Sequence, residues 1–94
     1  MFDKMKQLQQ MKEQMDAAKE RLNHISVKGE CQGITVVANG NKKIMEVSIP
    51  EGMDSEEIAE LIVIATNKAL ENAENVFESE MRGMAGGLMG GLGF

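Results

Sequence analysis

A narrow apolar stripe in the first 25 residues constrains the fold of this chain more than any other feature. From Asp3 to His24 the sequence has no glycine, proline or β-branched residue, and good helix formers dominate. The apolar residues of this segment follow alternating spacings of three and four positions: Leu8, Met11, Met15, Ala18, Leu22 and Ile25. This spacing predicts one long helix whose narrow stripe packs against another helix or a sheet. A membrane-surface helix is the alternative, but the acidic residues beside the stripe would repel anionic lipid.

Between residues 25 and 49 the periodicity changes from that of a helix to that of strands. β-branched residues become frequent and apolar side chains alternate with period two. Asn39-Gly40 lies between two such runs, residues 34–37 and 44–47, and favours a tight hairpin in which both turn residues adopt positive φ. With residues 25–31 as a further strand and Gly33 at the turn, the sequence predicts a three-stranded antiparallel meander.

A second long helix is predicted over residues 55–82. Asp54, followed three residues later by Glu57, resembles a capping box at its start. The run 61–65 is apolar all round, so it should be buried on more than one side, under the sheet and at a subunit contact. We therefore expect a dimer interface that contains Leu61, Ile62, Ile64 and Ala65. The predicted fold class is α+β, in the order α-β-β-β-α, dimeric with projecting helices.

The 94 residues are expected to form a single domain over residues 1–82 and a flexible tail over residues 83–94. Half of the tail is glycine, and its few apolar side chains cannot offset the backbone entropy lost on ordering. A hydrophobic contact for a partner is the alternative function of its Met and Leu residues. The domain has no Trp or Tyr, so its core is thin and a second subunit is favoured.

The sparse reactive side chains exclude most enzyme chemistry. One His and one Cys are too few for converging nucleophile, base and orienting groups, so we expect no catalysis, no metal, no cofactor and no small-molecule substrate. No apolar run approaches the roughly 20 residues of a membrane span, and no signal peptide is expected. The single cysteine fits a reducing compartment. These features predict a cytoplasmic protein without a membrane partner.

The charge is divided unevenly along the chain. The net charge of −5 alone argues against a nucleic-acid partner. However, residues 1–43 contain eight basic and five acidic side chains, net +3, whereas residues 44–94 contain two basic and ten acidic ones, net −8. One positive face is therefore possible on an acidic protein. Scattered lysines on a helix usually serve solubility, so composition alone leaves the function open.

The order of segments resembles the YbaB/EbfC family of bacterial nucleoid-associated proteins. The resemblance covers the whole chain and rests most on three parts: the Gly33–Gly40 part of the meander, the Ala65–Ala69 block of the second helix, and the Gly/Met/Leu tail. The first helix matches mostly in composition. The resemblance implies a homodimer whose sheets associate and whose long helices grip duplex DNA in the nucleoid.

The same resemblance implies DNA contacts on the basic residues of the two helices. On the first helix these are Lys4, Lys6, Lys12, Lys19 and Arg21, and on the second they are Lys68 and Arg82. Lys42 and Lys43, beside the hairpin turn, are added on the basis of charge. The alternative function is a dimeric protein–protein interaction module with no nucleic-acid role, which would present its acidic helix and Met-rich tail to partners.

Overall fold

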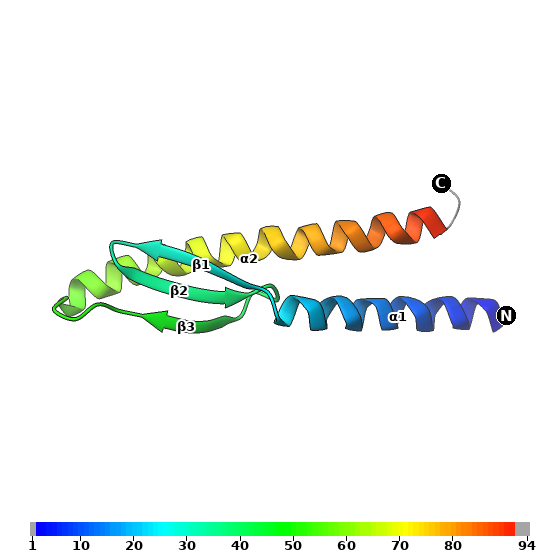
Figure 1. Ribbon diagram of the computed structural model, residues 1–94, viewed down its shortest axis with the longest axis horizontal. Helices are drawn as coiled ribbons and strands as arrows, with labels where there is room; N and C mark the ends of the chain where they lie inside the picture. The colour runs from blue at the N-terminus through cyan, green and yellow to red at the C-terminus, as the bar shows by residue number, and fades with distance from the viewer. Residues whose placement is uncertain (1, 92–94) are drawn as a thin grey trace.

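Two helices of unequal length and a three-stranded sheet make up the computed structural model (Figure 1). The structure describes the backbone of residues 2–91 and the side chains of residues 4–84. The elements, in chain order, are α1 (Phe2–Asn23), β1 (Ser26–Cys31), β2 (Ile34–Asn39), β3 (Ile44–Ser48) and α2 (Ser55–Gly91). The predicted α+β class and the α-β-β-β-α order are confirmed.

The core lies between the sheet and the first half of α2. The strands are antiparallel in the order β1-β2-β3, and α2 packs against β1 and β2. The inward-facing residues of β2 meet a row of small residues on α2, and the fully buried members are Ile34, Val36, Ala38, Ala65, Ala69 and Ala73. Alanines at spacings of four let the helix approach the sheet closely. β3 lies farthest from α2, and all five of its residues are exposed (Figure 1).

The two helices extend from the sheet in the same direction as a pair of antiparallel arms (Figure 1). The chain is therefore elongated, with extents of 64 × 21 × 16 Å. Near the sheet the apolar stripe of α1 is buried, because Ala18 and Leu22 have no exposed surface. Farther out the stripe is open, and Leu8 is 66% exposed. The predicted stripe is thus present, and only its last two turns are covered within the described part of one subunit.

The predicted hairpin is in the right place, but its predicted turn geometry is wrong. The two-residue turn with positive φ lies between β1 and β2, at Gln32 (φ 47°) and Gly33 (φ 95°). Between β2 and β3 the positive φ belongs to Lys42 (φ 65°) instead. Gly40 is required there for space, because a Cβ on it would lie 2.7 Å from Cδ2 of Leu22.

The start of α2 follows the prediction and its end does not. The Asp54 carboxylate accepts a hydrogen bond from the Glu57 N–H at 2.9 Å, which caps the helix. The end predicted at Arg82 is wrong, because the helical backbone continues to Gly91 and gives a helix of 37 residues. Residues 92–94 and the side chains of 85–91 lie outside the described residues. The predicted flexibility of residues 83–94 therefore stays a prediction.

Candidate nucleic-acid interface

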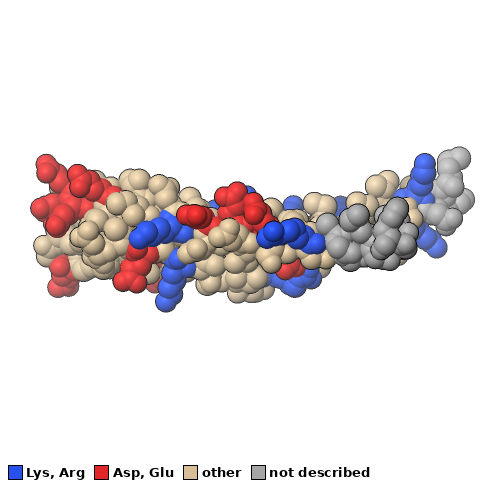
Figure 2. All heavy atoms as spheres, turned by 90° about the horizontal axis from the view of Figure 1, so that it is seen from above, with Lys and Arg blue, Asp and Glu red and all other residues tan. Residues whose placement is uncertain are grey.

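Charge is segregated along the long axis of the molecule. Figure 2 shows acidic side chains crowded at the end that carries the β3–α2 connection, whereas basic side chains are spread, among some acidic ones, from the middle toward the end where the chain begins. The exposed acidic residues near the start of α2 are Glu51, Asp54, Glu56, Glu57 and Glu60. An anionic partner would therefore be repelled from this end and attracted toward the lysines of α1 and of the β2–β3 connection.

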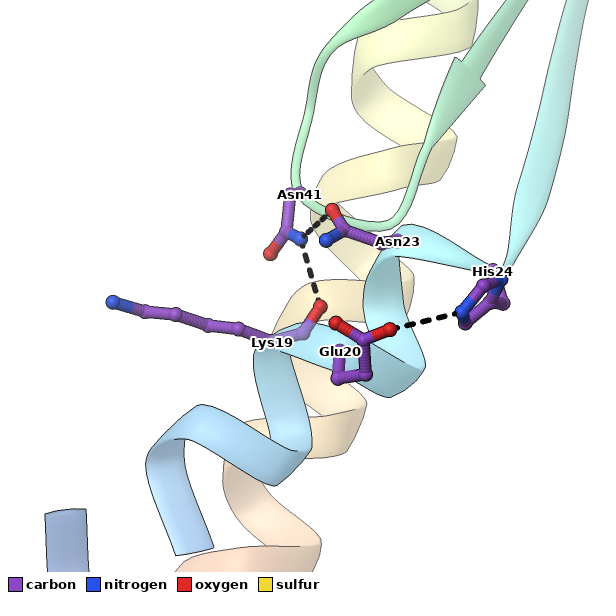
Figure 3. A network of polar contacts seen from close by, with 5 residues as sticks. All are labelled: Lys19, Glu20, Asn23, His24 and Asn41. Atoms are coloured by element: carbon purple, nitrogen blue, oxygen red, sulfur yellow. Dashed lines mark hydrogen bonds and ion pairs between the residues drawn. The ribbon is translucent and has the colours of Figure 1, made fainter. Parts of the chain in front are cut away.

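Four predicted DNA-binding lysines lie exposed on α1: Lys4, Lys6, Lys12 and Lys19. Lys12 and Lys19 are seven positions apart, about two helical turns, so they project from the same side of the arm. The Lys19 side chain points away from the neighbouring polar contacts (Figure 3). These ammonium groups are placed to meet a long anionic ligand that runs along α1.

Two further predicted lysines lie on the β2–β3 connection, next to the end of α1. The side-chain nitrogen of Asn41, Nδ2, donates to the Lys19 carbonyl at 3.0 Å and also to Oδ1 of Asn23 (Figure 3). Lys42 places its ammonium 4.5 Å from the centre of the Phe77 ring on α2, a cation–π contact. Lys43 is exposed. The fold thus joins the backbone of Lys19 to the segment that carries Lys42 and Lys43, where α1 and the connection meet, and we call these three residues the basic junction.

The other predicted DNA-binding residues are placed differently. Arg21 pairs with Glu80 of α2. The Lys68 ammonium donates to the carbonyl of Glu30 in β1 at 3.1 Å. Arg82 is exposed on α2, at the rim of a hollow lined by Phe77 and Met81. Arg21 and Lys68 therefore have intramolecular partners that charge counting did not predict. DNA contact by any of the nine basic residues stays a prediction.

The four residues predicted for a dimer interface divide between the core and the surface. Leu61 and Ala65 are buried inside the subunit, at 8% and 0% exposure. Ile62 is partly buried against the core, whereas Ile64 is 45% exposed. The run 61–65 was apolar all round partly because it fills the subunit's own core. The interface itself stays a prediction.

An exposed apolar surface lies along β3. The predicted dimer interface did not include this surface. Val47 pairs with Val36 and Ile44 with Ala38, so both point to the face of the sheet that carries the core. α2 leaves this part of that face open, and Ile44, Val47 and Ile49 are each 42% exposed. The sequence of residues 44–49 already indicated this surface, because the apolar side chains of a strand are normally buried by another element or another subunit.

Asparagines form the main site feature that the sequence analysis missed. Asn39 was expected to be a turn residue with positive φ; it is instead the last residue of β2 and is 4% exposed. Its side-chain oxygen accepts hydrogen bonds from the N–H groups of Asn41 (2.9 Å) and Lys43 (3.2 Å). Asn23 and Asn41 then join the connection to α1. Three asparagines at the ends of predicted elements were the available signal.

Among the described residues, no three His, Cys, Asp or Glu side chains lie together as a metal site. Nε2 of His24 lies 3.2 Å from the carboxylate of Glu20, an exposed pair near the end of α1 (Figure 3). Within residues 2–91, neither helix is long and apolar enough to cross a membrane.

The fold and the surface define the class of this protein: a small, elongated α+β protein with paired helical arms and segregated charge. Residues 1–88 match the YbaB/EbfC DNA-binding family, and the chain belongs to this family. A nucleoid-associated protein of Caldanaerobacter subterraneus is 38% identical over 87% of this chain and 79% of its own length. Another, of Chlorobium phaeobacteroides, is 36% identical over 95% of this chain and 84% of its own. A third, of Chlorobaculum tepidum, is 38% identical over 93% of this chain and 82% of its own length.

Proposed function

We propose that this protein binds duplex DNA as a homodimer, largely through phosphate contacts, in the bacterial nucleoid, where it serves nucleoid organisation or gene regulation. The observation that carries the proposal is the segregation of charge, with basic residues on α1 and the β2–β3 connection and acidic residues at the opposite end. Membership of a DNA-binding family supports DNA as the ligand that we propose for this surface.

The two edges of the sheet differ in a way that supports a homodimer. At β1, side chains of α2 satisfy two backbone carbonyls: Asn72 donates to the carbonyl of Lys28 at 2.8 Å and Lys68 to that of Glu30. At the other edge, β3 is exposed along its whole length and carries an open apolar face. An unprotected apolar edge strand favours association, and a second copy offers the same surface in a two-fold arrangement.

In this dimer two sets of basic residues act on one DNA molecule. Lysines on both α1 arms contact phosphate oxygens along the backbone, which fixes the position of the protein without selecting a base sequence. The chain has no Trp or Tyr, and of its three Phe residues Phe77 already faces the Lys42 ammonium, so we expect stacking on bases to contribute little. We therefore expect binding that depends strongly on salt and discriminates weakly between sequences, well below the roughly 10³-fold or more of specific regulators.

A salt titration of duplex-DNA binding, followed by fluorescence anisotropy, tests the proposal. If the dimer neutralises about 4 to 6 phosphates, log K should fall with log[salt] at a slope of about −4 to −5. The double variant Lys12→Glu/Lys19→Glu should abolish binding while light scattering still shows a dimer. Lys12→Glu alone should weaken binding much more than Lys28→Glu, a matched charge change on β1. A dimer that does not bind DNA even at low salt would support the protein–protein interaction module instead.

A further inference from the structure

Asn41 occupies an unusual position between two basic segments. It lies on the β2–β3 connection, yet its side-chain nitrogen donates to the backbone carbonyl of Lys19 and to the side chain of Asn23, both on α1 (Figure 3). The neighbouring Gly40 N–H adds a backbone hydrogen bond to the Leu22 carbonyl at 2.9 Å. The connection therefore caps the end of α1, where helix carbonyls lack partners within the helix.

The connection is also fixed internally, around the buried Asn39. The side-chain oxygen of Asn39 accepts hydrogen bonds from the N–H groups of Asn41 and Lys43. The backbone N–H of Asn39 donates to the Lys43 carbonyl at 2.9 Å. The Lys42 N–H donates to the Asn39 carbonyl at 3.0 Å. This arrangement holds Lys42 in the left-handed region, where a side chain other than Gly, Asn or Asp is uncommon. The backbone that carries Lys42 and Lys43 is thus held by hydrogen bonds within the connection and by hydrogen bonds to α1.

These contacts place three basic residues, Lys19, Lys42 and Lys43, on two segments whose backbones are joined. Like charges held on joined segments repel one another unless an anion binds near them. A phosphate group would remove that repulsion, and a cluster that is already ordered loses less conformational entropy on binding than a free loop does. Asn39 makes the contacts that order Lys42 and Lys43, and Asn41 links the segment that carries them to the backbone of Lys19.

We infer that Asn41 is a positioning residue for DNA: by joining the β2–β3 connection to α1, it holds the basic junction, Lys19, Lys42 and Lys43, as one preformed phosphate-binding site. The inference rests on the proposed DNA binding and extends it from separate lysines to one ordered cluster. Asn41 acts through the lysines and need not contact DNA itself.

A double-mutant cycle on the full chain tests this role, with duplex-DNA affinity measured at one fixed salt concentration. Asn41→Ala should weaken binding by about 5- to 20-fold when Lys42 and Lys43 are present, and by less than about 2-fold in the Lys42→Ala/Lys43→Ala background. The slope of log K against log[salt] should become less negative by about 1 to 2, as one or two phosphate contacts are lost. Asn67→Ala, an exposed asparagine on α2, is the matched control and should leave binding unchanged.

Equal losses of affinity in the two backgrounds, or no loss in either, would overturn the inference while leaving DNA binding itself intact. Absence of DNA binding by the unmodified protein would instead remove the proposed function. Because Asn41→Ala could lower stability, the native protein provides a second measurement by NMR. On addition of duplex DNA, backbone shifts should change together at Lys19 and residues 40–43. Changes confined to the outer half of α1 would contradict a preformed junction.

Discussion

Nε of Arg21 on α1 donates to the carboxylate of Glu80 on α2 at 2.7 Å, and the two residues are 59 positions apart in the chain. Among the residues whose side chains the structure describes, this pair is the ion pair that joins the two arms. More than half of the Arg21 side chain remains exposed, so the pair contributes only about 0 to 1 kcal/mol to stability. Its larger effect is on charge, because Glu80 neutralises one of the cations that we propose for DNA binding.

Replacing Glu80 should therefore release Arg21 for DNA. We expect Glu80→Gln to change the free energy of unfolding by less than about 1 kcal/mol and to strengthen DNA binding. Glu78→Gln removes the same charge two residues away, from an exposed side chain, and is the control for a general change of potential. Affinity measurements at low salt compare the two variants. An equal gain in both would show that the Arg21–Glu80 pair has no specific influence.

Because β1 approaches α2 closely at Gly29, adding a single methyl group there should lower the stability of the fold. A Cβ at Gly29 would overlap the backbone of α2 at Ala65 and Ala69. Gly29→Ala should therefore lower the free energy of unfolding by about 1 to 3 kcal/mol, because neither backbone can move without opening the core. Gly83→Ala is the opposite case, since its Cβ would meet open space outside the core, and it should change the free energy of unfolding by less than about 0.5 kcal/mol. Urea unfolding measures both changes.

The open face of β3 should control assembly. Val47→Lys puts a charge on the face that we propose is covered by the second subunit, so it should convert the dimer to a folded monomer. Ser48→Lys adds the same charge to the other face of the strand and should leave the dimer intact. Light scattering and circular dichroism give the mass and the fold of each variant. A dimer that persists with Lys at position 47 would place the interface on another surface.

Removal of residues 83–94 should leave thermal stability nearly unchanged. The buried residues that α2 contributes to the core lie between Leu61 and Ala73, well before the deletion point. Residues that contact no core contribute little to the cooperative unfolding transition. The melting temperatures of the full and shortened chains provide the measurement. A drop of more than about 5 °C, equivalent to roughly 1 kcal/mol for a domain of this size, would mean that the tail packs on the protein.

Periodicity predicted the elements of this fold because the relevant forces are local. The stripe on α1 and the alternation along β2 follow from which face of each element is buried. Turn geometry depended on contacts distant in sequence. Gly40 is needed because Leu22 packs against it, and Asn39 is buried because its side chain closes the next turn. Neither relation could be obtained from the sequence of residues 39 and 40 alone.

The candidate site shows a similar division. Charge counting located the basic half of the chain, but it could not assign partners to individual side chains. Arg21 and Lys68 are bound to Glu80 and to a strand carbonyl because the fold places α2 beside α1 and β1. Asn41, an uncharged residue, was not considered for the DNA site, since its importance lies in which segments it joins.

α2 is one continuous helix from the sheet to the end of its arm, so any tilt at its base would be passed on to its tip. The part beyond Ala73 is about 27 Å long at 1.5 Å per residue, and a tilt of about 10° at the base would move its tip by about 5 Å. This shift is a large fraction of the width of a DNA groove. In the proposed dimer, a small change of packing between the sheet and the base of α2 would therefore change the distance between the arms of the two subunits.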